Sequence, residues 1–145
     1  MKEEQKLMEN DLKLQKDYAR EIDGYLKQDR SAIEAYGAKI ENGLIVNYDE
    51  LIDKQVKAYN AAVDKYNKSS QSDADKETFE KAEEKYEEFL EKLEQYEETY
   101  EKYLDQEQAI ADKELEIWEK NNEIIVEAIE QRVEKFEDAI DALSE

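Results

Sequence analysis

Residues 74 to 143 contain neither glycine nor proline, and this uninterrupted stretch constrains the fold more than any other feature of the sequence. Glycine and proline are the residues that most often end a helix, and the whole chain contains no proline. At about 1.5 Å per residue, a single helix over this stretch would be roughly 100 Å long. A helix of that length indicates a coiled coil.

The apolar residues of this stretch recur at alternating intervals of three and four, which is the spacing of a heptad coiled coil. A first run ends at Tyr103 and a second begins at Leu115, and the stripe is predicted to pass between them through Glu107 and Ala111. Spacings of four in succession form a stutter, which unwinds a left-handed supercoil. The runs are Phe79, Ala82, Tyr86, Phe89, Leu93, Tyr96, Tyr100, Tyr103 and Leu115, Trp118, Asn122, Ile125, Ile129, Val133, Phe136, Ile140, Leu143.

The rest of the chain predicts two more helices and two short connections. Helices are expected over residues 2–36 and 47–68, a turn over 37–46, and a serine-rich tip over 69–73 before the long helix 74–143. All of these elements are expected to belong to one coiled-coil module spanning 1–145. The apolar stripe predicted for the first helix consists of Leu7, Leu14, Tyr18, Ile22, Tyr25, Leu26, Ile33 and Tyr36.

The turn and the start of the second helix carry specific local signals. Asn42-Gly43 is the commonest dipeptide of a tight hairpin turn. Asn47 is expected to be the helix N-cap, with Glu50 closing a capping box and Val46 acting as a hydrophobic staple. A compact turn with some β character is therefore expected between the two helices.

Charge is distributed unequally between the two halves of the chain. Residues 1–72 carry 14 acidic and 12 basic side chains, whereas residues 73–145 carry 27 acidic and 9 basic side chains. Two copies of the long helix would therefore repel each other, whereas the nearly neutral first half can lie against it at little electrostatic cost. We expect a monomer at low salt, with any weak self-association strengthened by salt.

The sequence therefore predicts an all-α fold: a long antiparallel coiled-coil hairpin with one arm interrupted near residues 37–46. If the serine-rich stretch is the hairpin tip, positions equidistant from it face each other. The expected neighbours are Ile52 with Phe89, Tyr59 with Ala82, Leu26 with Leu115, and Met8 with Val133. The turn would fall opposite Tyr96, Tyr100 and Tyr103, whose rings could cover it while their hydroxyls stay in contact with water.

The composition excludes most catalytic and metal chemistry. The chain has no cysteine and no histidine, so thiolate nucleophiles, zinc ribbons and the usual general base are absent. A net charge of −20 argues against binding to nucleic acid or anionic membrane surfaces, and no apolar run approaches the length of a membrane span. We predict a non-enzymatic protein with no catalytic, cofactor-binding or metal-binding residues and no cofactor.

Acidic pairs at helical spacing, such as Glu84 with Glu88 or Glu94 with Glu98, are expected from composition alone and are interpreted as solvated helix faces. Four acidic residues also fall at ligand positions of a calcium loop: Asp73, Asp75, Glu77 and Glu84. The sixth loop position is Thr78 where such a loop needs glycine. The favoured interpretation is a helix start capped by Ser72 or Asp73.

The ten tyrosines are interpreted mainly as core or seam residues because most of them fall on the apolar stripes. Trp118 and Asn122 lie one helical turn apart on the same stripe. A single asparagine at a core position usually fixes the register of a coiled coil at some cost in stability. We expect Asn122 to have this role.

The order of motifs resembles helical segments of tail tape-measure and other virion-associated proteins of gut bacteriophages. The resemblance is carried by the turn ENGLIVNYDEL, the helix KAYNAAVDKYN and the helix FEKAEEKYEEFLEKLEQYEETYE, and covers about residues 30–130. It implies a structural role inside a phage tail, a location in the virion, and no catalytic residues.

Partners are expected to be other proteins or the rest of a longer parent chain, because neither end of the sequence carries a clear helix-terminating signal. An alternative function is a bacterial adaptor or surface module. Such a module would grip a protein partner through Tyr96 to Tyr103 or through the turn at Gly43.

Overall fold

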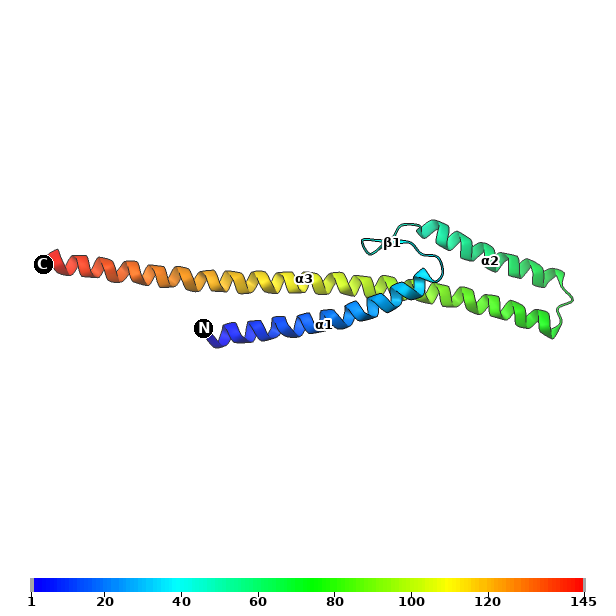
Figure 1. Ribbon diagram of the computed structural model, residues 1–145, viewed down its shortest axis with the longest axis horizontal. Coiled ribbons are helices and arrows are strands. Elements are labelled where there is room, and N and C mark those ends of the chain that lie inside the picture. Colours follow the sequence, from blue (N-terminus) through cyan, green and yellow to red (C-terminus); the bar gives the residue numbers. More distant parts are fainter. Residues whose placement is uncertain (1, 145) are drawn as a thin grey trace. The chain divides into compact units, whose positions relative to one another are not determined.

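The computed structural model describes residues 2–144, of which 88% are helical. The helices are α1 (Lys2–Glu34), α2 (Tyr48–Lys68) and α3 (Asp73–Ser144), and two short strands, β1 (Ile40–Glu41) and β2 (Leu44–Ile45), connect α1 to α2 (Figure 1). The predicted all-α antiparallel hairpin with an interrupted first arm is confirmed. No described helix contains a stretch that is both long and apolar enough to cross a membrane.

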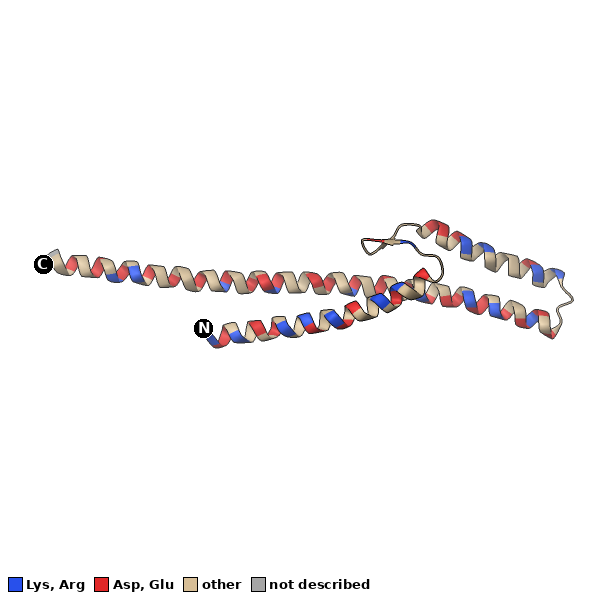
Figure 2. Cartoon of the chain, viewed as in Figure 1, with Lys and Arg blue, Asp and Glu red and all other residues tan. Residues whose placement is uncertain are grey.

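The helices contribute to two compact units. Unit 1 consists of the chain up to Ala19 and the segment from Asp105 onward, and unit 2 consists of Arg20–Leu104. Acidic side chains outnumber basic ones along α3, whereas the two signs of charge are more nearly balanced along α1 and α2 (Figure 2).

The core of unit 2 is a single apolar cluster drawn from all three helices and the β-hairpin. Ile33, Leu51 and Phe89 are its most deeply buried side chains. Full burial of one such side chain stabilises a fold by about 1.5–3 kcal/mol. The buried members are Ile33, Ala38, Leu51, Phe89, Leu93 and Tyr96, and Leu26, Tyr36, Ile40, Ile45, Ile52 and Tyr100 pack against them.

The end of α1 is set by a glycine. The predicted helix 2–36 ends at Glu34, because Gly37 has a φ of 107° that a helix cannot continue. The Gly37 amide donates to the Glu34 carbonyl (2.9 Å) and the Ala38 amide donates to the Ile33 carbonyl (3.4 Å). These two bonds form a Schellman motif, and its accompanying apolar contact places Ala38 and Ile33 in the core.

The two helices on either side of the tip are joined by stacked aromatic rings. The Tyr66 and Phe79 centroids lie 5.0 Å apart, and those of Tyr59 and Tyr86 lie 5.1 Å apart. Tyr59 therefore lies across from the turn of α3 that contains Ala82, as the sequence predicted. Ile52 likewise packs against the cluster that contains Phe89.

The register predicted for α1 is wrong in both units. In unit 2, Leu26 packs on the core cluster, and Thr99 donates to the Asp29 carboxylate (2.5 Å). In unit 1, Met8 lines a recess with Lys120 and Ile124 instead of meeting Val133. The prediction treated residues 37–46 as an advancing part of the arm. The β-hairpin instead folds back on itself, so α1 meets an earlier part of α3.

The stripe predicted for α1 is only partly correct. Leu7, Leu14, Tyr18 and Tyr25 are between 50% and 67% exposed. The shielded residues lie on a neighbouring face with the same heptad spacing: Gln5, Met8, Leu12, Gln15, Ala19, Ile22 and Leu26. The prediction marked the wrong face over the first part of α1, because the seam there includes Gln15 and Ala19 whereas the larger apolar Leu14 is exposed.

In unit 1, α3 also shields a different set of residues from the set predicted. Glu107 and Ala111, through which the stutter was expected to pass, are exposed, as are Leu115 and Trp118. The shielded residues keep four-three spacing: Gln106, Ile110, Lys113, Ile117, Lys120 and Ile124. Lys113 reaches Asp11 of α1 (3.8 Å), and Gln106 donates to the Gln15 carbonyl (3.0 Å).

Candidate interaction surface

The β-hairpin between α1 and α2 is the most distinctive local structure in unit 2. Its strands pair Ile40 with Ile45 and Glu41 with Leu44. The two turn residues, Asn42 (φ 51°) and Gly43 (φ 80°), both have positive φ, as a type I′ turn requires. The predicted tight turn is therefore confirmed.

Tyrosines of α3 hold this turn against the helix. The Tyr96 hydroxyl donates to the Gly43 carbonyl (2.6 Å), and the Tyr100 hydroxyl donates to the Asn42 carbonyl (3.1 Å). The Tyr96 and Tyr100 rings stack with centroids 6.2 Å apart, and Tyr103 extends the row. The turn lies opposite these rings as predicted, but the two hydroxyls bind backbone carbonyls where contact with water was expected.

Glycine is required at position 43 for two independent reasons. Its φ of 80° is one that other residues rarely adopt, and a Cβ atom there would lie 2.1 Å from the Tyr100 ring. Burial, together with the neighbouring Tyr100 and Glu34, raises the pKa of Tyr96, and the nearby Arg30 opposes that rise. The Tyr96 hydroxyl therefore stays protonated and remains a hydrogen-bond donor.

Asn47 closes the base of the hairpin and does not form the predicted capping box. Its side chain accepts a hydrogen bond from the Lys39 amide (2.8 Å) and donates one to the Gly37 carbonyl (3.0 Å). No side-chain hydrogen bond caps α2, although Asn47 is its N-cap residue. Val46, expected to act as a staple, is 54% exposed. The Asn47 side chain binds Lys39 and Gly37 instead of capping α2, because the closed hairpin brings both backbone groups within hydrogen-bond distance.

The hairpin, once held in this way, presents apolar side chains to solvent. Leu44 is 62% exposed, and Val46 and Tyr48 are also exposed. Burial and a hydrogen bond to the Glu97 carboxylate raise the pKa of Tyr48. We call Leu44, Val46 and Tyr48 the hairpin patch. It is chemically suited to bind an apolar surface of another protein.

In comparisons with known proteins, no family model, curated protein or solved structure matches the chain.

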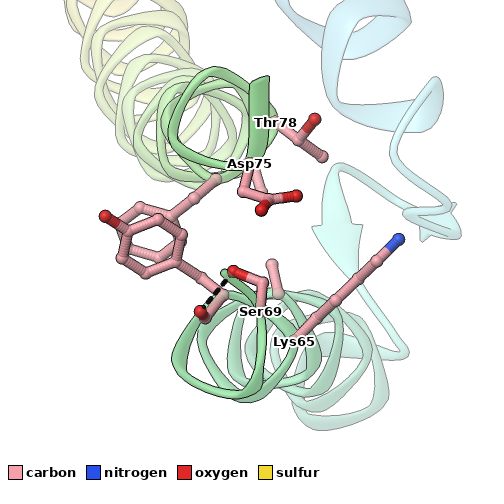
Figure 3. Close-up of a pocket in the computed structure, with 8 residues that line it drawn as sticks. Lys65, Ser69, Asp75 and Thr78 are labelled. Carbon is pink, nitrogen blue, oxygen red and sulfur yellow. Dashed lines mark hydrogen bonds between the residues drawn. The ribbon is translucent and has the colours of Figure 1, made fainter. Parts of the chain in front are cut away.

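The tip holds a small recess of about 120 Å³ beside the aromatic stack (Figure 3). Asp75 and Thr78 of α3 face Lys65 of α2 across it, and the Ser69 hydroxyl donates to the Tyr66 carbonyl (2.7 Å). Hydrogen bonds from Ser70 and Ser72 lower the pKa of Asp75. A carboxylate that stays ionised in this way does not suit a general acid.

Ser72 and Asp75 instead form a capping box at the start of α3. The Asp75 amide donates to the Ser72 hydroxyl (3.2 Å), and the Ser72 amide donates to the Asp75 carboxylate (3.3 Å). One of the two predicted caps, Ser72, is therefore confirmed, and Asp73 is the first helical residue.

The acidic pairs and the calcium-loop positions lie on a continuous helix. Glu84, Glu88, Glu94 and Glu98 are exposed, as expected for solvated faces. Residues 73–84 are helical throughout, so they cannot wrap around an ion as a calcium loop does. Among residues 2–144, no group of three or more acidic side chains could hold a metal ion.

A lysine-lined groove was missed by the sequence reasoning. Three lysines, Lys54 of α2 and Lys85 and Lys92 of α3, line a groove beside the end of α1, together with three alanines. Glu88 lies in the same groove. Burial raises the pKa of Tyr36, and the charge of Glu88 and the hydrogen bond that its carboxylate accepts from the Tyr36 hydroxyl raise it further. Lys85 and Lys92 are seven residues apart and share a face of α3, but only the packing of α2 against α3 brings Lys54 beside them, so the groove could not be predicted from spacing alone.

Trp118 and Asn122 do not lie in the seam between α1 and α3. Trp118 is 63% exposed, and the Asn122 side chain donates to the Trp118 carbonyl one turn earlier (2.8 Å). Asn122 therefore does not fix the register of α1 against α3. Both residues belong to an outer face of α3.

Proposed function

We propose that this chain is a non-enzymatic, structural coiled-coil module of a bacteriophage tail tape-measure or virion protein. The observation that carries the proposal is α3, a helix of 72 residues without glycine or proline, held in a hairpin with α1 and α2. An element of this kind suits a strut or spacer, because its length is fixed by residue number at about 1.5 Å per residue.

The resemblance to phage proteins rests on the segments that build the turn and the tip. The turn sequence around Asn42-Gly43 forms the type I′ hairpin, and the tyrosine-asparagine helix supplies Tyr59 and Tyr66 to the aromatic stack. The acidic surface of α3 also suits a protein that must not adhere to DNA passing nearby. These features support a place in the virion.

The test is to locate the protein in particles. Virions would be purified from a host strain that carries the gene, and their tails would be analysed by mass spectrometry and by electron microscopy with antibody raised against residues 48–104. We expect peptides of this chain in intact tails and a reduced amount after DNA ejection has been triggered. Detection only in the soluble fraction of the host would contradict the proposal.

A second candidate function is a bacterial adaptor or surface module, and the exposed hairpin patch favours it. Leu44 and Val46 point away from a turn that Tyr96 and Tyr100 hold in place, which is a rigid way to present apolar side chains. In this role the tyrosines would support the binding surface from beneath.

Two sets of variants separate the candidates. Replacing Tyr96, Tyr100 and Tyr103 by alanine should lower helicity and thermal stability if the tyrosines are structural. Leu44→Ser with Val46→Ser should leave stability unchanged. If that double variant abolishes binding of a partner recovered with the wild-type chain, the adaptor function gains support. If the binding of every such partner is unchanged, the adaptor function is contradicted.

A further inference from the structure

The last part of α3 carries an apolar stripe that no residue of α1 covers. Beyond Ile124 the helix continues past the first residues of α1 (Figure 1), and its large apolar residues are between 46% and 88% exposed. With Trp118 and Asn122 they form one line, which we call the outer stripe. Its apolar members are Trp118, Ile125, Val126, Ile129, Val133, Phe136, Ile140 and Leu143.

The outer stripe is not a continuation of the seam that α1 occupies. The α3 seam residues in unit 1 end with Ile117, Lys120 and Ile124. The same heptad positions further along are Glu127, Gln131, Glu134, Asp138 and Asp141, all of which are polar and exposed. A helix that continued α1 in a straight line would therefore pack against these polar side chains. A helix that covers the outer stripe must lie on a different side of α3.

The residues of the outer stripe have the pattern of a parallel two-stranded coiled coil. Asn122 is the one polar residue in the line, and a single asparagine at an a position favours an in-register dimer. The a positions after it are β-branched, Ile129, Val133 and Ile140, with one extra four-residue step between the first two. The d positions are Trp118 and Ile125 on either side of Asn122, and Phe136 and Leu143 after the extra step.

Flanking charges point to a second copy of this chain in the same orientation. With Val133 at a, Arg132 is the g residue and Glu137 is the e residue of the next heptad. In a parallel, in-register dimer these g and e′ positions are neighbours, so each interface edge gains one pair of opposite charges. An antiparallel pair would bring e next to e′ and g next to g′, and therefore like charges together.

We propose that two copies of this chain associate through the outer stripes of α3, parallel and in register, over residues 122–143. This inference rests on unit 1 alone and does not depend on a location in a virion. The excess of acidic residues after position 72 opposes the association, so the dimer should tighten as salt screens that repulsion.

Sedimentation equilibrium of the full chain tests the association. We expect a monomer–dimer equilibrium whose dissociation constant falls by at least threefold between 20 mM and 300 mM sodium chloride. Phe136→Asp should weaken the dimer by tenfold or more. Leu14→Asp is the matched control, because Leu14 of α1 is as exposed as Phe136, at 67%, and lies off the stripe. Far-ultraviolet circular dichroism of each variant establishes that the helices are retained.

Cross-linking tests the orientation, because the natural chain has no cysteine. Oxidation of Leu143→Cys should give a covalent dimer in high yield, whereas Asp138→Cys, on the polar face, should give little. A monomer at every protein and salt concentration would overturn the proposal, as would a trimer or a Phe136→Asp variant that associates normally. Equal cross-linking of the two cysteine variants would overturn the parallel, in-register arrangement.

Discussion

Units 1 and 2 use similar helical arms but join them with different chemistry. Unit 2 has a continuous apolar cluster around Phe89 and aromatic pairs along its length. The seam of unit 1 includes glutamine and lysine side chains: Gln106 donates to the backbone of α1, and Lys113 forms a 3.8 Å ion pair with Asp11. Buried apolar area stabilises a fold more than exposed polar pairs do. Unit 2 should therefore be the more stable region.

Unit 2 is held in one arrangement by its own contacts, whereas unit 1 leaves apolar side chains available to a partner. Unit 2 has specific contacts that fix how its elements pack. Tyr96 and Tyr100 hold the β-hairpin against α3, and the Schellman motif fixes the end of α1. Among the described apolar residues of unit 1, only Met8 and Ala19 are buried, and large side chains of α3 stay exposed. A region with few buried contacts opens more easily and gains more from association.

The largest expected effect contrasts the two cores directly. Phe89→Ala should lower the free energy of unfolding of unit 2 by about 3–5 kcal/mol, because Phe89 is fully buried. Met8→Ala in unit 1 should cost about 2 kcal/mol, since fewer neighbours surround a helix pair. Hydrogen exchange resolved by peptide reports each unit separately under native conditions. Equal losses of protection would show that the two units unfold as one.

The second prediction uses two glycines in unit 2. Gly43→Ala should destabilise the fold by about 2 kcal/mol, because it combines a strained φ with a clash against the Tyr100 ring. Gly24→Ala should stabilise by about 0.5–1 kcal/mol, since Gly24 lies inside α1 with nothing within 4 Å of the new methyl group. Urea unfolding followed by circular dichroism measures both. A neutral Gly43→Ala would show that the hairpin is not tightly held.

The third prediction concerns polar groups, which should act in opposite directions in the two units. Tyr96→Phe should destabilise unit 2 by about 1 kcal/mol, because the Gly43 carbonyl loses its donor. Gln15→Leu should stabilise unit 1 by about 1 kcal/mol, because the buried Gln15 Oε1 has no hydrogen-bond partner. Hydrogen exchange by unit is again the measurement. A destabilising Gln15→Leu would indicate that the polar seam is needed for packing.

The sequence predicted those features of the fold that depend on local signals. The long α3, the Asn42-Gly43 turn and the Ser72 cap each follow from spacing or from residue types with few alternatives. The exposure of the acidic pairs was also predicted, because carboxylates that outnumber the available cations are costly to bury and therefore face solvent.

The helix faces of unit 1 and the register of α1 could not be predicted, for two physical reasons. Both faces of α1 have heptad spacing, and the shielded face contains Gln15 and Ala19 while the exposed face contains Leu14 and Tyr18. The register depends on how far the hairpin advances along α3, which is a property of its three-dimensional path. Asn47 shows the same limit, since its partners Lys39 and Gly37 come within reach only after the hairpin has closed.

The smallest expected effect is a loss of stability of unit 2 at alkaline pH. Burial is the first cause that raises the pKa values of Tyr36, Tyr48 and Tyr96, all of which belong to unit 2. A raised folded-state pKa means that the unfolded chain loses its proton first. The stability from these tyrosines is therefore complete below pH 10 and declines as the pH rises from 10 through the folded-state values. Urea unfolding between pH 9 and pH 11 should show this decline, and Tyr96→Phe should make it shallower by removing one titrating group. An unchanged slope in Tyr96→Phe would show that the Tyr96 hydroxyl ionises as readily in the folded chain as in the unfolded one.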